Sequence, residues 1–403
     1  MVFALPDPVL TALRRLNARG HQAYAVGGCV RDLLRGVTPH DYDICASCPP
    51  EETHACFADE RVIDTGIKHG TVTVMLGDMP LEITTFRTDG AYADGRHPSA
   101  VTFTRNLAED LKRRDYTVNA MAYHPQEGVI DLFGGQDDLK ARVIRCVGDA
   151  ETRLTEDALR ILRAIRFSAQ LDFAIAPDTA DAMRKLCGRL SLVSRERVAE
   201  ELLKTVQYPA AADVLRAFPE VFQAAMPDFP VDALFDGAAA LNRLPGGDAV
   251  LGLAALLHCC DAGALQVCLD SLKLSKALEG QTFQLALNAG SNFPASDAPL
   301  MLAELGQEQF RRLLLLQQAC GVCTAAEAQQ RTAAAQTAVK KKLPMTVHDL
   351  PITGNDLLAL GLKGPAIGQT LTELQRMALR GELACEREAM LAWVRERIRS
   401  GLS

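Results

Sequence analysis

Two aspartates placed two residues apart are the feature of this sequence with the most direct chemical use. Asp41 and Asp43 belong to the run Asp-Tyr-Asp-Ile-Cys, which is typical of a short buried strand. Side chains two residues apart on a strand point to the same side, so both carboxylates would face one ligand. Carboxylate oxygens suit Mg²⁺. The pair therefore predicts a magnesium site, although an isolated Asp-x-Asp more often marks an exposed turn.

Glu82 is the candidate for a third carboxylate at this site. It lies in a predicted strand, 81–86, among apolar neighbours, where an unpaired charge would be costly. A neighbouring strand could complete a two-metal site, in which one metal activates an attacking hydroxyl and the other binds the leaving oxygens. We expect Asp41, Asp43 and Glu82 to act in catalysis, and Asp41 and Asp43 to hold the metal.

A glycine pair ahead of the aspartates suggests where a phosphate would bind. Gly27 and Gly28 separate a short apolar run from a helical pattern. Glycines let backbone N–H groups come close to a phosphate, and a helix N-terminus favours an anion. Arg31 lies one turn into that helix and can reach the same phosphate. The turn is neither a Walker A loop, because no Gly-Lys-Ser/Thr follows, nor a Gly-x-Gly-x-x-Gly loop.

Two further segments concentrate arginines. The first, residues 113–122, begins Arg-Arg-Asp-Tyr-Thr. The second places Asp157, Arg160, Arg163 and Arg166 at three-residue spacing, so that they share one broad helix face. A face of this kind is commonly solvated, with ion pairs inside the helix. Because apolar residues surround these arginines, we expect their polar side to face a cleft.

The elements that must position these residues fall into two regions. Strands are predicted over 23–26, 41–45, 72–76 and 81–86, with helices over 1–20 and 29–35. Residues 86–100 are polar and predict a mobile loop. From about residue 150 the strand signals end, and helical periodicity covers 154–206, 209–224, 233–242, 248–290, 300–340 and 366–399. We therefore expect an α+β fold, with a small mixed sheet in the head followed by an all-helical remainder.

Composition limits the class of protein. The chain has 403 residues, of which 48% are hydrophobic and 23% charged, so it can bury a core and form two or three domains. It has no run of about 18 uncharged apolar residues and no basic, apolar leader at its start, so we expect a cytoplasmic protein without a membrane partner.

Charge and cysteine content exclude two further classes of protein. The net charge of −7 argues against a simple nucleic-acid coat protein, although basic residues outnumber acidic ones over 340–403 and could form a local RNA track. The two Cys-x-x-Cys pairs, at 45/48 and 320/323, lie too far apart to make a zinc ribbon. We expect the twelve cysteines to be reduced thiols.

Four of these motifs, in this order, resemble those of class II tRNA nucleotidyltransferases. That family comprises the bacterial and eukaryotic CCA-adding enzymes, with the bacterial poly(A) polymerases as close relatives. The motifs are Val26-Gly27-Gly28-Cys29-Val30-Arg31-Asp32, the Asp41/Asp43 pair, the segment from Arg113 to Ala122, and Glu156-Asp157-Ala158-Leu159-Arg160. Together they cover about residues 24–170.

The resemblance implies a division into four parts and a role for each motif. The parts are a nucleotidyltransferase head at 1–148, a nucleotide-selecting neck at 149–210, a body at 211–339 and a tRNA-binding tail at 340–403. Asp41 and Asp43 would hold Mg²⁺. Nucleotide-binding residues would be Gly27, Gly28, Arg31, Arg114, Asp157, Arg160, Arg163 and Arg166, of which Asp157 and Arg160 would read the edge of the incoming base. An Asp acceptor and an Arg donor can match cytosine or adenine, while wrong bases leave buried polar groups unpaired.

Two more segments resemble parts of the same family. The loop at 87–98 is similar to the flexible loop with which CCA-adding members switch from C to A, except that His97 stands where an arginine is common. Residues 350–368 look like the tail of bacterial CCA-adding enzymes. There Lys363 and Gly364 precede a helix that begins near Pro365, a plausible RNA phosphate site, or else a plain packing unit.

The function that these features imply is addition of C, C and A to the 3′ end of tRNA. The substrates would be CTP and ATP, the cofactor Mg²⁺ and the partner tRNA, with no obligate protein partner. Three alternatives stay open: a CC-adding specialist, a poly(A) polymerase of the same class, and a non-catalytic RNA-binding protein. The last is the least expected, because a binding protein has no need for clustered carboxylates beside an RNA end.

Overall fold

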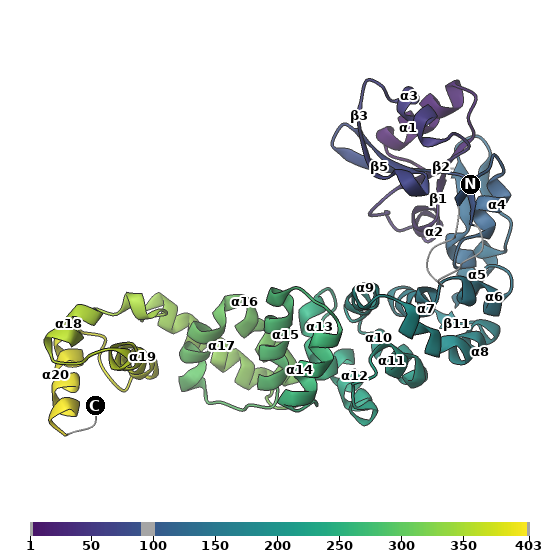
Figure 1. Cartoon of the computed structure of the whole chain (residues 1–403). Helices are drawn as coiled ribbons and strands as arrows, with labels where there is room; N and C mark the ends of the chain where they lie inside the picture. Colours follow the sequence, from purple (N-terminus) through teal and green to yellow (C-terminus); the bar gives the residue numbers. More distant parts are fainter. Residues whose placement is uncertain (1–2, 90–100, 401–403) are drawn as a thin grey trace. The chain divides into compact units, whose positions relative to one another are not determined.

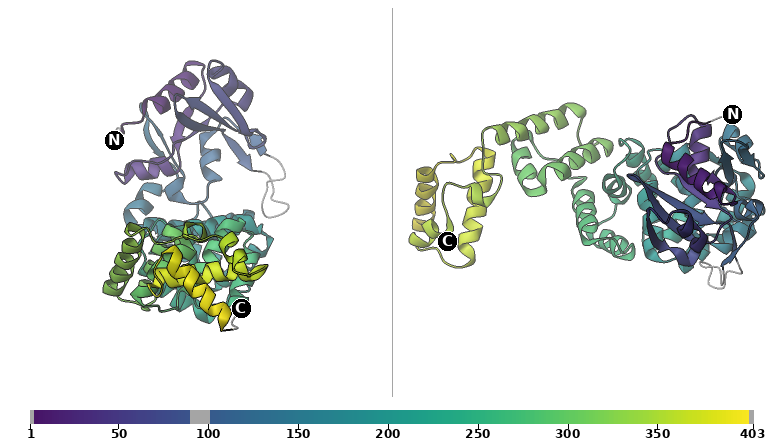
Figure 2. Two further views of the ribbon diagram at one scale, coloured as in Figure 1. Left: turned by 90° about the vertical axis from the view of Figure 1, so that its left-hand side faces the viewer. Right: turned by 90° about the horizontal axis from the view of Figure 1, so that it is seen from above.

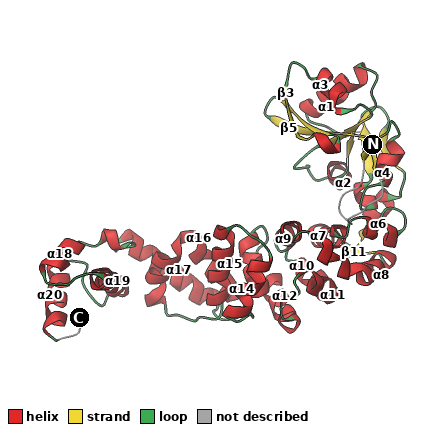
Figure 3. Ribbon diagram, viewed as in Figure 1, coloured by secondary structure: helices red, strands yellow, loops and turns green. Residues whose placement is uncertain are grey.

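The structure, a computed structural model, describes residues 3–89 and 101–400 and divides into two compact units. The first runs up to Val231 and includes Asp270–Leu274; the second comprises Asp232–Leu269 and the chain from Ser275 onward. All strands of the described residues lie in the first unit, whereas the second is helical (Figure 3). The expected α+β fold is therefore confirmed, and the division into four parts stays a prediction.

A seven-stranded mixed sheet organises the head of the first unit (Figure 1). Its strands are β1 (Ala23–Val26), β2 (Asp43–Ala46), β3 (Arg61–Gly66), β4 (Thr71–Leu76), β5 (Met79–Thr85), β8 (Met121–His124) and β9 (Gly128–Asp131). Their order across the sheet is β3-β4-β5-β2-β1-β8-β9. Strands β2 and β5 are parallel, and the other neighbouring pairs are antiparallel. The sheet therefore brings together two chain segments, β2 and β5, that are well separated in sequence.

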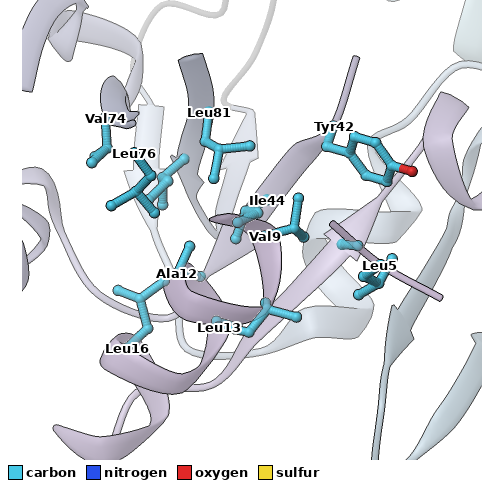
Figure 4. Close-up of a cluster of buried hydrophobic side chains, with 14 of the residues drawn as sticks. Leu5, Val9, Ala12, Leu13, Leu16, Tyr42, Ile44, Val74, Leu76 and Leu81 are labelled. Atoms are coloured by element: carbon cyan, nitrogen blue, oxygen red, sulfur yellow. The ribbon is translucent and has the colours of Figure 1, made fainter. Parts of the chain in front are cut away.

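One face of this sheet is covered by the N-terminal helix α1 (Asp7–Ala18). Apolar residues recur along α1 at helical spacing, so a single stripe of the helix is buried. Figure 4 shows that stripe packed on inward-facing strand residues, and Figure 2 shows the same helix-on-sheet layer from two further directions. The side chains of this core include Val9, Ala12, Leu13 and Leu16 from the helix and Ile44, Val74, Leu76 and Leu81 from the strands.

The opposite face of the sheet carries the candidate chemistry. Alternate residues of a strand point to opposite faces. Ile44 packs under α1, whereas Cys45 belongs to a separate small core with Phe86 and Leu111 on the other side. Asp43, two residues before Cys45, therefore lies on the face away from α1.

The segment predicted as a loop at 86–100 is paired at both of its ends. Strands β6 (Arg87–Asp89) and β7 (Val101–Phe103) form a two-stranded antiparallel ribbon. The prediction of a loop was thus wrong for Arg87–Asp89, whereas β7 begins just after the predicted loop. Residues 90–98 of the predicted switch loop, with His97, lie outside the described residues. A second short ribbon joins β10 (Val143–Ile144) to β11 (Ala174–Ile175), beyond the point where the sequence predicts no more strand.

Helices make up most of the remaining described residues. In the first unit they are α2 (Gly28–Leu34), α3 (Pro50–Cys56), α4 (Leu107–Lys112), α5 (Gly135–Ala141), α6 (Ala150–Glu156), α7 (Leu159–Leu171), α8 (Pro177–Leu186), α9 (Arg195–Thr205), α10 (Ala211–Ala217) and α11 (Pro219–Ala225). Those after Val231 are α12 (Leu234–Asn242), α13 (Ala249–Leu257), α14 (Ala262–Ser271), α15 (Lys276–Asn288), α16 (Ala298–Ala319), α17 (Ala325–Lys340), α18 (Gly354–Ala359), α19 (Pro365–Arg380) and α20 (Arg387–Arg399). The helices from α7 onward lie where the periodicity predicts helix, except α18, whereas the short helices α3, α4 and α5 were not predicted. In the part of the chain that the structure describes, no helix has the length and apolar character needed to cross a membrane.

Candidate active site

Asp43 and Glu82 are direct neighbours in the sheet. Asp43 begins β2 and pairs in register with Glu82 of the parallel strand β5. Both side chains are exposed. Asp41 precedes the strand, which starts two residues later than the sequence predicts, but exposure still alternates through Asp41, Tyr42 and Asp43. Asp43 and Glu82 thus lie side by side on central strands of the sheet, and Asp41 lies just before the start of β2.

Like charges act on Asp43 at this position. Loss of hydration raises its pKa, the charges of Glu82 and Asp41 raise it further, and Arg114 opposes them. A cation between these carboxylates would remove that repulsion. As the side chains stand, the described residues contain no group of three His, Cys, Asp or Glu that could hold a metal ion. Asp41 instead lies 3.0 Å from Nδ1 of His40, and because both side chains are largely exposed this contact is easily exchanged for another.

The glycine turn lies at the end of β1, next to the start of β2. Gly27 links β1 to α2 with φ +81°, a conformation that side chains disfavour, and its N–H bonds the carbonyl of Met121 at 3.1 Å. Because Val26 pairs in register with Asp43, the turn leaves β1 beside the aspartate strand. A Cβ on Gly27 would lie 3.2 Å from Nη1 of Arg114. Only glycine therefore allows the turn and the arginine to pack this closely.

Arg31 lies behind the glycine turn, largely buried. Its Nε and Nη2 donate to the carboxylate of Asp32 at 2.9 and 3.0 Å, and its Nη1 donates to Oδ1 of Asn119 at 2.8 Å. Its guanidinium folds back over Gly28, where a Cβ would lie 3.6 Å from Nη2. The predicted phosphate-binding arginine is thus at the turn and is held there by two protein partners.

Arg114 is the second arginine at the turn. It follows helix α4, and its Nη2 donates to Oδ2 of Asp110 at 3.3 Å. Burial lowers the pKa of Arg114, but the charge of Asp110, with a contribution from Asp43, outweighs burial and raises it. Sequence reasoning did not single out Asp110. Its place one helical turn before Arg113 and Arg114 was the available signal.

Two arginines of α7 pair with buried carboxylates. Arg163 lies with Nε 2.8 Å and Nη2 2.6 Å from Oδ2 of Asp115, and Arg166 Nε lies 2.9 Å from Oε2 of Glu201 in α9. Burial alone would raise the pKa of Asp115, yet Arg163 lowers it to about 2. Glu201 is a functional candidate that the sequence analysis missed, because its partners lie on another helix.

The ring of Phe167 gathers three of these guanidinium groups. The guanidinium carbons of Arg166, Arg163 and Arg31 lie 4.4, 5.2 and 5.7 Å from the ring centre. Such cation–π contacts hold a cation over an aromatic face without neutralising it. The arginine row of α7 and the helix after the glycine turn therefore meet at one aromatic side chain.

Asp157 is held by an arginine from α9. Its Oδ2 accepts from Nη2 of Arg197 at 2.8 Å. Its Oδ1 accepts the backbone N–H of Leu159, the first residue of helix α7, at 3.0 Å. Arg197 was not predicted as a site residue. The carboxylate is largely but not fully covered, with 16% of the side chain exposed.

Arg160 departs from the expectation that the arginine face opens into a cleft. It is 8% exposed, and its Nη1 and Nη2 donate to the carbonyls of Arg153 at 2.8 Å and Arg113 at 3.1 Å. It also pairs with Glu156. For Arg160 that expectation was wrong, since backbone carbonyls next to the head motif occupy the polar end of the side chain.

Lys363 and Gly364 lie at the start of α19, in the second unit. Lys363 is exposed, and Gly364 caps the helix with φ +59° directly before Pro365. The helix therefore starts where the sequence predicts. The two residues are displayed rather than buried.

Three family models match the chain. They are described as the Poly A polymerase head domain, over residues 23–145, the probable RNA and SrmB-binding site of polymerase A, over 172–220, and tRNA nucleotidyltransferase domain 2, over 249–394. The first contains the sheet, the glycine turn and the carboxylates.

Relatives of similar length are described as CCA-adding enzymes. A CCA-adding enzyme of Lactobacillus delbrueckii subsp. bulgaricus is 38% identical, covering 98% of this chain and 97% of the relative, and one of Enterococcus faecalis is 36% identical over 96% and 95%. The crystal structure of the Bacillus stearothermophilus CCA-adding enzyme in complex with CTP is similar with a TM-score of 0.85, at 30% identity over 98% of this chain and 99% of that one. The chain belongs to the family of CCA-adding enzymes, the class II tRNA nucleotidyltransferases.

Proposed function

We propose that this nucleotidyltransferase completes the 3′ end of tRNA by adding C, C and A in turn from CTP and ATP. In each step the terminal hydroxyl oxygen bonds the α-phosphorus, the bond from that phosphorus to the bridging oxygen breaks, and pyrophosphate leaves. The hydroxyl proton passes to solvent. The observation that carries the proposal is the register pair of Asp43 and Glu82 beside the turn at Gly27, in a chain whose relatives are CCA-adding enzymes.

Enzymes of this family depend on a divalent metal ion, and here we propose Mg²⁺ held by Asp41 and Asp43, with Glu82 beside them. Carboxylate oxygens are the hard ligands that Mg²⁺ takes, and the crowding that raises the pKa of Asp43 marks a place where a cation is favourable. When bound, the ion would lower the pKa of the attacking hydroxyl and neutralise charge at the phosphate. The chain's own part is to hold Asp43 and Glu82 on adjacent central strands, with Asp41 just before β2.

The triphosphate would bind along the turn from Gly27 to Gly28. Backbone N–H groups at the start of a helix and a nearby guanidinium favour phosphate oxygens. Arg114 lies against this turn, and Arg31 lies beneath it. These groups would orient the α-phosphorus toward the carboxylates and keep the β- and γ-phosphates in place as the leaving group.

The base would be selected by Asp157 and Arg160, with Arg163 and Arg166 supporting the pocket. Asp157 keeps part of its carboxylate exposed, so it can accept from a base amino group. For Arg160 to donate to a base, it must exchange one present partner, of which the Glu156 carboxylate is a side chain and the easiest to move.

We propose the predicted tail, 340–403, as the part that holds tRNA away from the reacting end. It has its own apolar core, and Lys363 and Gly364 lie exposed at the start of α19. Head, neck and body would correspond to 1–148, 149–210 and 211–339. We propose the cytoplasm as the location, where tRNA is found and where the cysteines, free thiols in the structure, stay reduced.

The experiment that tests this function uses tRNA lacking its CCA end, with labelled CTP and ATP supplied separately and together in the presence of Mg²⁺. Products are sized at single-nucleotide resolution. Two nucleotides from CTP alone and three from both are the expected result, and a chelator should abolish both. A stop at two with both nucleotides would indicate a CC-adding specialist, a long ladder from ATP alone a poly(A) polymerase, and no extension a binding protein.

A further inference from the structure

Asp110 is a buried carboxylate that none of the proposed steps uses. It lies in helix α4 with no exposed surface. Its Oδ1 accepts from Nε of Arg113 at 2.9 Å and from the backbone N–H of Arg87 at 3.3 Å, and its Oδ2 accepts from Nη2 of Arg114 at 3.3 Å. A charge this deeply buried is retained only where its partners compensate it. Two guanidinium groups do so here.

The bond to Asp110 decides where the guanidinium of Arg114 lies. Within the described residues that is the one hydrogen bond of its side chain, and it uses Nη2 alone. Nη1, which has no hydrogen bond among the described residues, lies within 3.2 Å of the place of a Cβ on Gly27. The free donor is therefore directed at the turn where we place the triphosphate.

A second carboxylate competes for Arg114. The guanidinium lies against the turn at Gly27, which continues from Val26, the register partner of Asp43, and the charge of Arg114 opposes the rise in the pKa of Asp43. An arginine with one buried partner removed closes on the next carboxylate, because an unpaired buried charge is costly. An ion pair with Asp43 would occupy the oxygens that the metal needs.

We infer that Asp110 is a positioning residue: it holds Arg114 at the glycine turn and away from Asp43, so that the arginine meets the triphosphate while the aspartate stays available to the metal. The inference rests on the proposed function and adds a division of labour between two carboxylates. Asp110 touches neither substrate nor metal. It acts through Arg114.

The test replaces the charge while keeping the shape. Asp110→Asn should weaken binding of CTP about tenfold to a hundredfold, measured by calorimetry without tRNA so that no transfer occurs. It should also weaken binding of Mn²⁺, measured by electron paramagnetic resonance. The matched control is Asp138→Asn, another buried carboxylate of the head that pairs with an arginine, Arg145, but lies on helix α5. The control should lose stability and keep both affinities.

A double-mutant cycle separates positioning from mere folding. If Asp110 acts through Arg114, then Arg114→Gln alone should weaken CTP binding. Adding Asp110→Asn to Arg114→Gln should change the CTP affinity less than twofold. The double variant should also bind Mn²⁺ as tightly as the wild type, because no arginine is left to pair with Asp43. Equal losses from Asp110→Asn in both backgrounds, or an unchanged CTP affinity in the single variant, would overturn the inference.

Two other outcomes are also decisive. If Asp110→Asn does not fold, the double variant carries the test, since it removes both charges together; CTP binding weaker than that of Arg114→Gln would refute the inference. If the wild-type chain binds CTP but extends no tRNA, the proposed function fails, whereas the dependence of CTP and Mn²⁺ binding on Asp110 is still measured.

Discussion

Arg163 and Asp115 join helix α7 to the arginine motif at 113–122, with Nε and Nη2 of Arg163 2.8 and 2.6 Å from Oδ2 of Asp115. Asp115 is buried, with 8% of its surface exposed, whereas 33% of the Arg163 side chain is exposed. Asp115 also accepts the backbone N–H of Tyr116 at 2.8 Å. The same carboxylate therefore fixes the arginine motif and helix α7 relative to one another.

Acid should therefore weaken the protein through Asp115. Its pKa is about 2 in the folded chain against an ordinary value of 3.8, so its contribution is present above about pH 4 and is lost as pH falls through 2. Asp115→Asn should cost roughly 2 kcal/mol in the free energy of unfolding at pH 7. Urea unfolding at a series of pH values checks this. The gap between variant and wild type should close at low pH, and a gap independent of pH would contradict it.

Asp43→Asn should abolish nucleotide transfer and leave the fold and tRNA binding intact. The variant removes the carboxylate charge at the strand start but keeps its size and exposed position. Rates of CMP incorporation and tRNA affinity by gel shift measure the two effects. Asp137→Asn, an exposed surface aspartate of the same head, is the control and should behave as wild type. Loss of tRNA binding in Asp43→Asn would count against a metal role.

Glu82→Gln should trade activity for stability. Like charges on adjacent strands are destabilising, so removing this one should raise the free energy of unfolding in a chelator by roughly 0.2–1 kcal/mol. Transfer should become slower and need more Mg²⁺, because one oxygen ligand or its charge is lost. Thermal unfolding with EDTA and a Mg²⁺ titration of the rate provide the readings. A variant less stable in EDTA would mean that Glu82 has a structural partner instead.

Gly27→Ala should weaken CTP binding beyond what its backbone strain explains. Gly27 and Gly20 both have positive φ, +81° and +84°, so alanine at either should cost about 1–2 kcal/mol of stability. A Cβ at Gly27 meets Arg114, whereas one at Gly20 meets nothing within 4 Å. CTP affinity should fall for Gly27→Ala and stay unchanged for Gly20→Ala. Equal affinities for the two variants would remove the role of Arg114 at the turn.

Local patterns predicted the framework of the head. The predicted strands at 72–76 and 81–86 correspond to β4 and β5. Glu82 was proposed as a partner of the aspartates, and the register places it beside Asp43, although its side chain is exposed rather than buried. Strand β8 was not predicted, because all four of its residues are buried and its sequence shows no alternation of apolar and polar residues. It overlaps the segment at 113–122, which was interpreted by its arginines rather than by its secondary structure.

Sequence patterns could not predict which hydrogen-bond and ion-pair partners the fold brings to each arginine. Spacing placed Arg160 and Arg163 on one helix face, but it could not tell a backbone carbonyl from solvent as the partner of a guanidinium. Glu201 and Arg197 lie on α9, about forty residues from the side chains that they pair with. Only the packing of α9 against α7 brings them together.

The parallel pairing of β2 with β5 has a consequence for folding. Hairpins form from neighbouring residues, but this pair closes a loop of roughly forty residues that contains α3, β3 and β4. Asp43 and Glu82 therefore become neighbours only when the centre of the sheet is complete, and their repulsion opposes that last closure. The Mg²⁺ that we propose at Asp41 and Asp43 would have the charge of Glu82 beside it only in the complete sheet. Its full binding energy would then be added to the finished sheet alone, so the ion would also favour complete heads over incomplete ones.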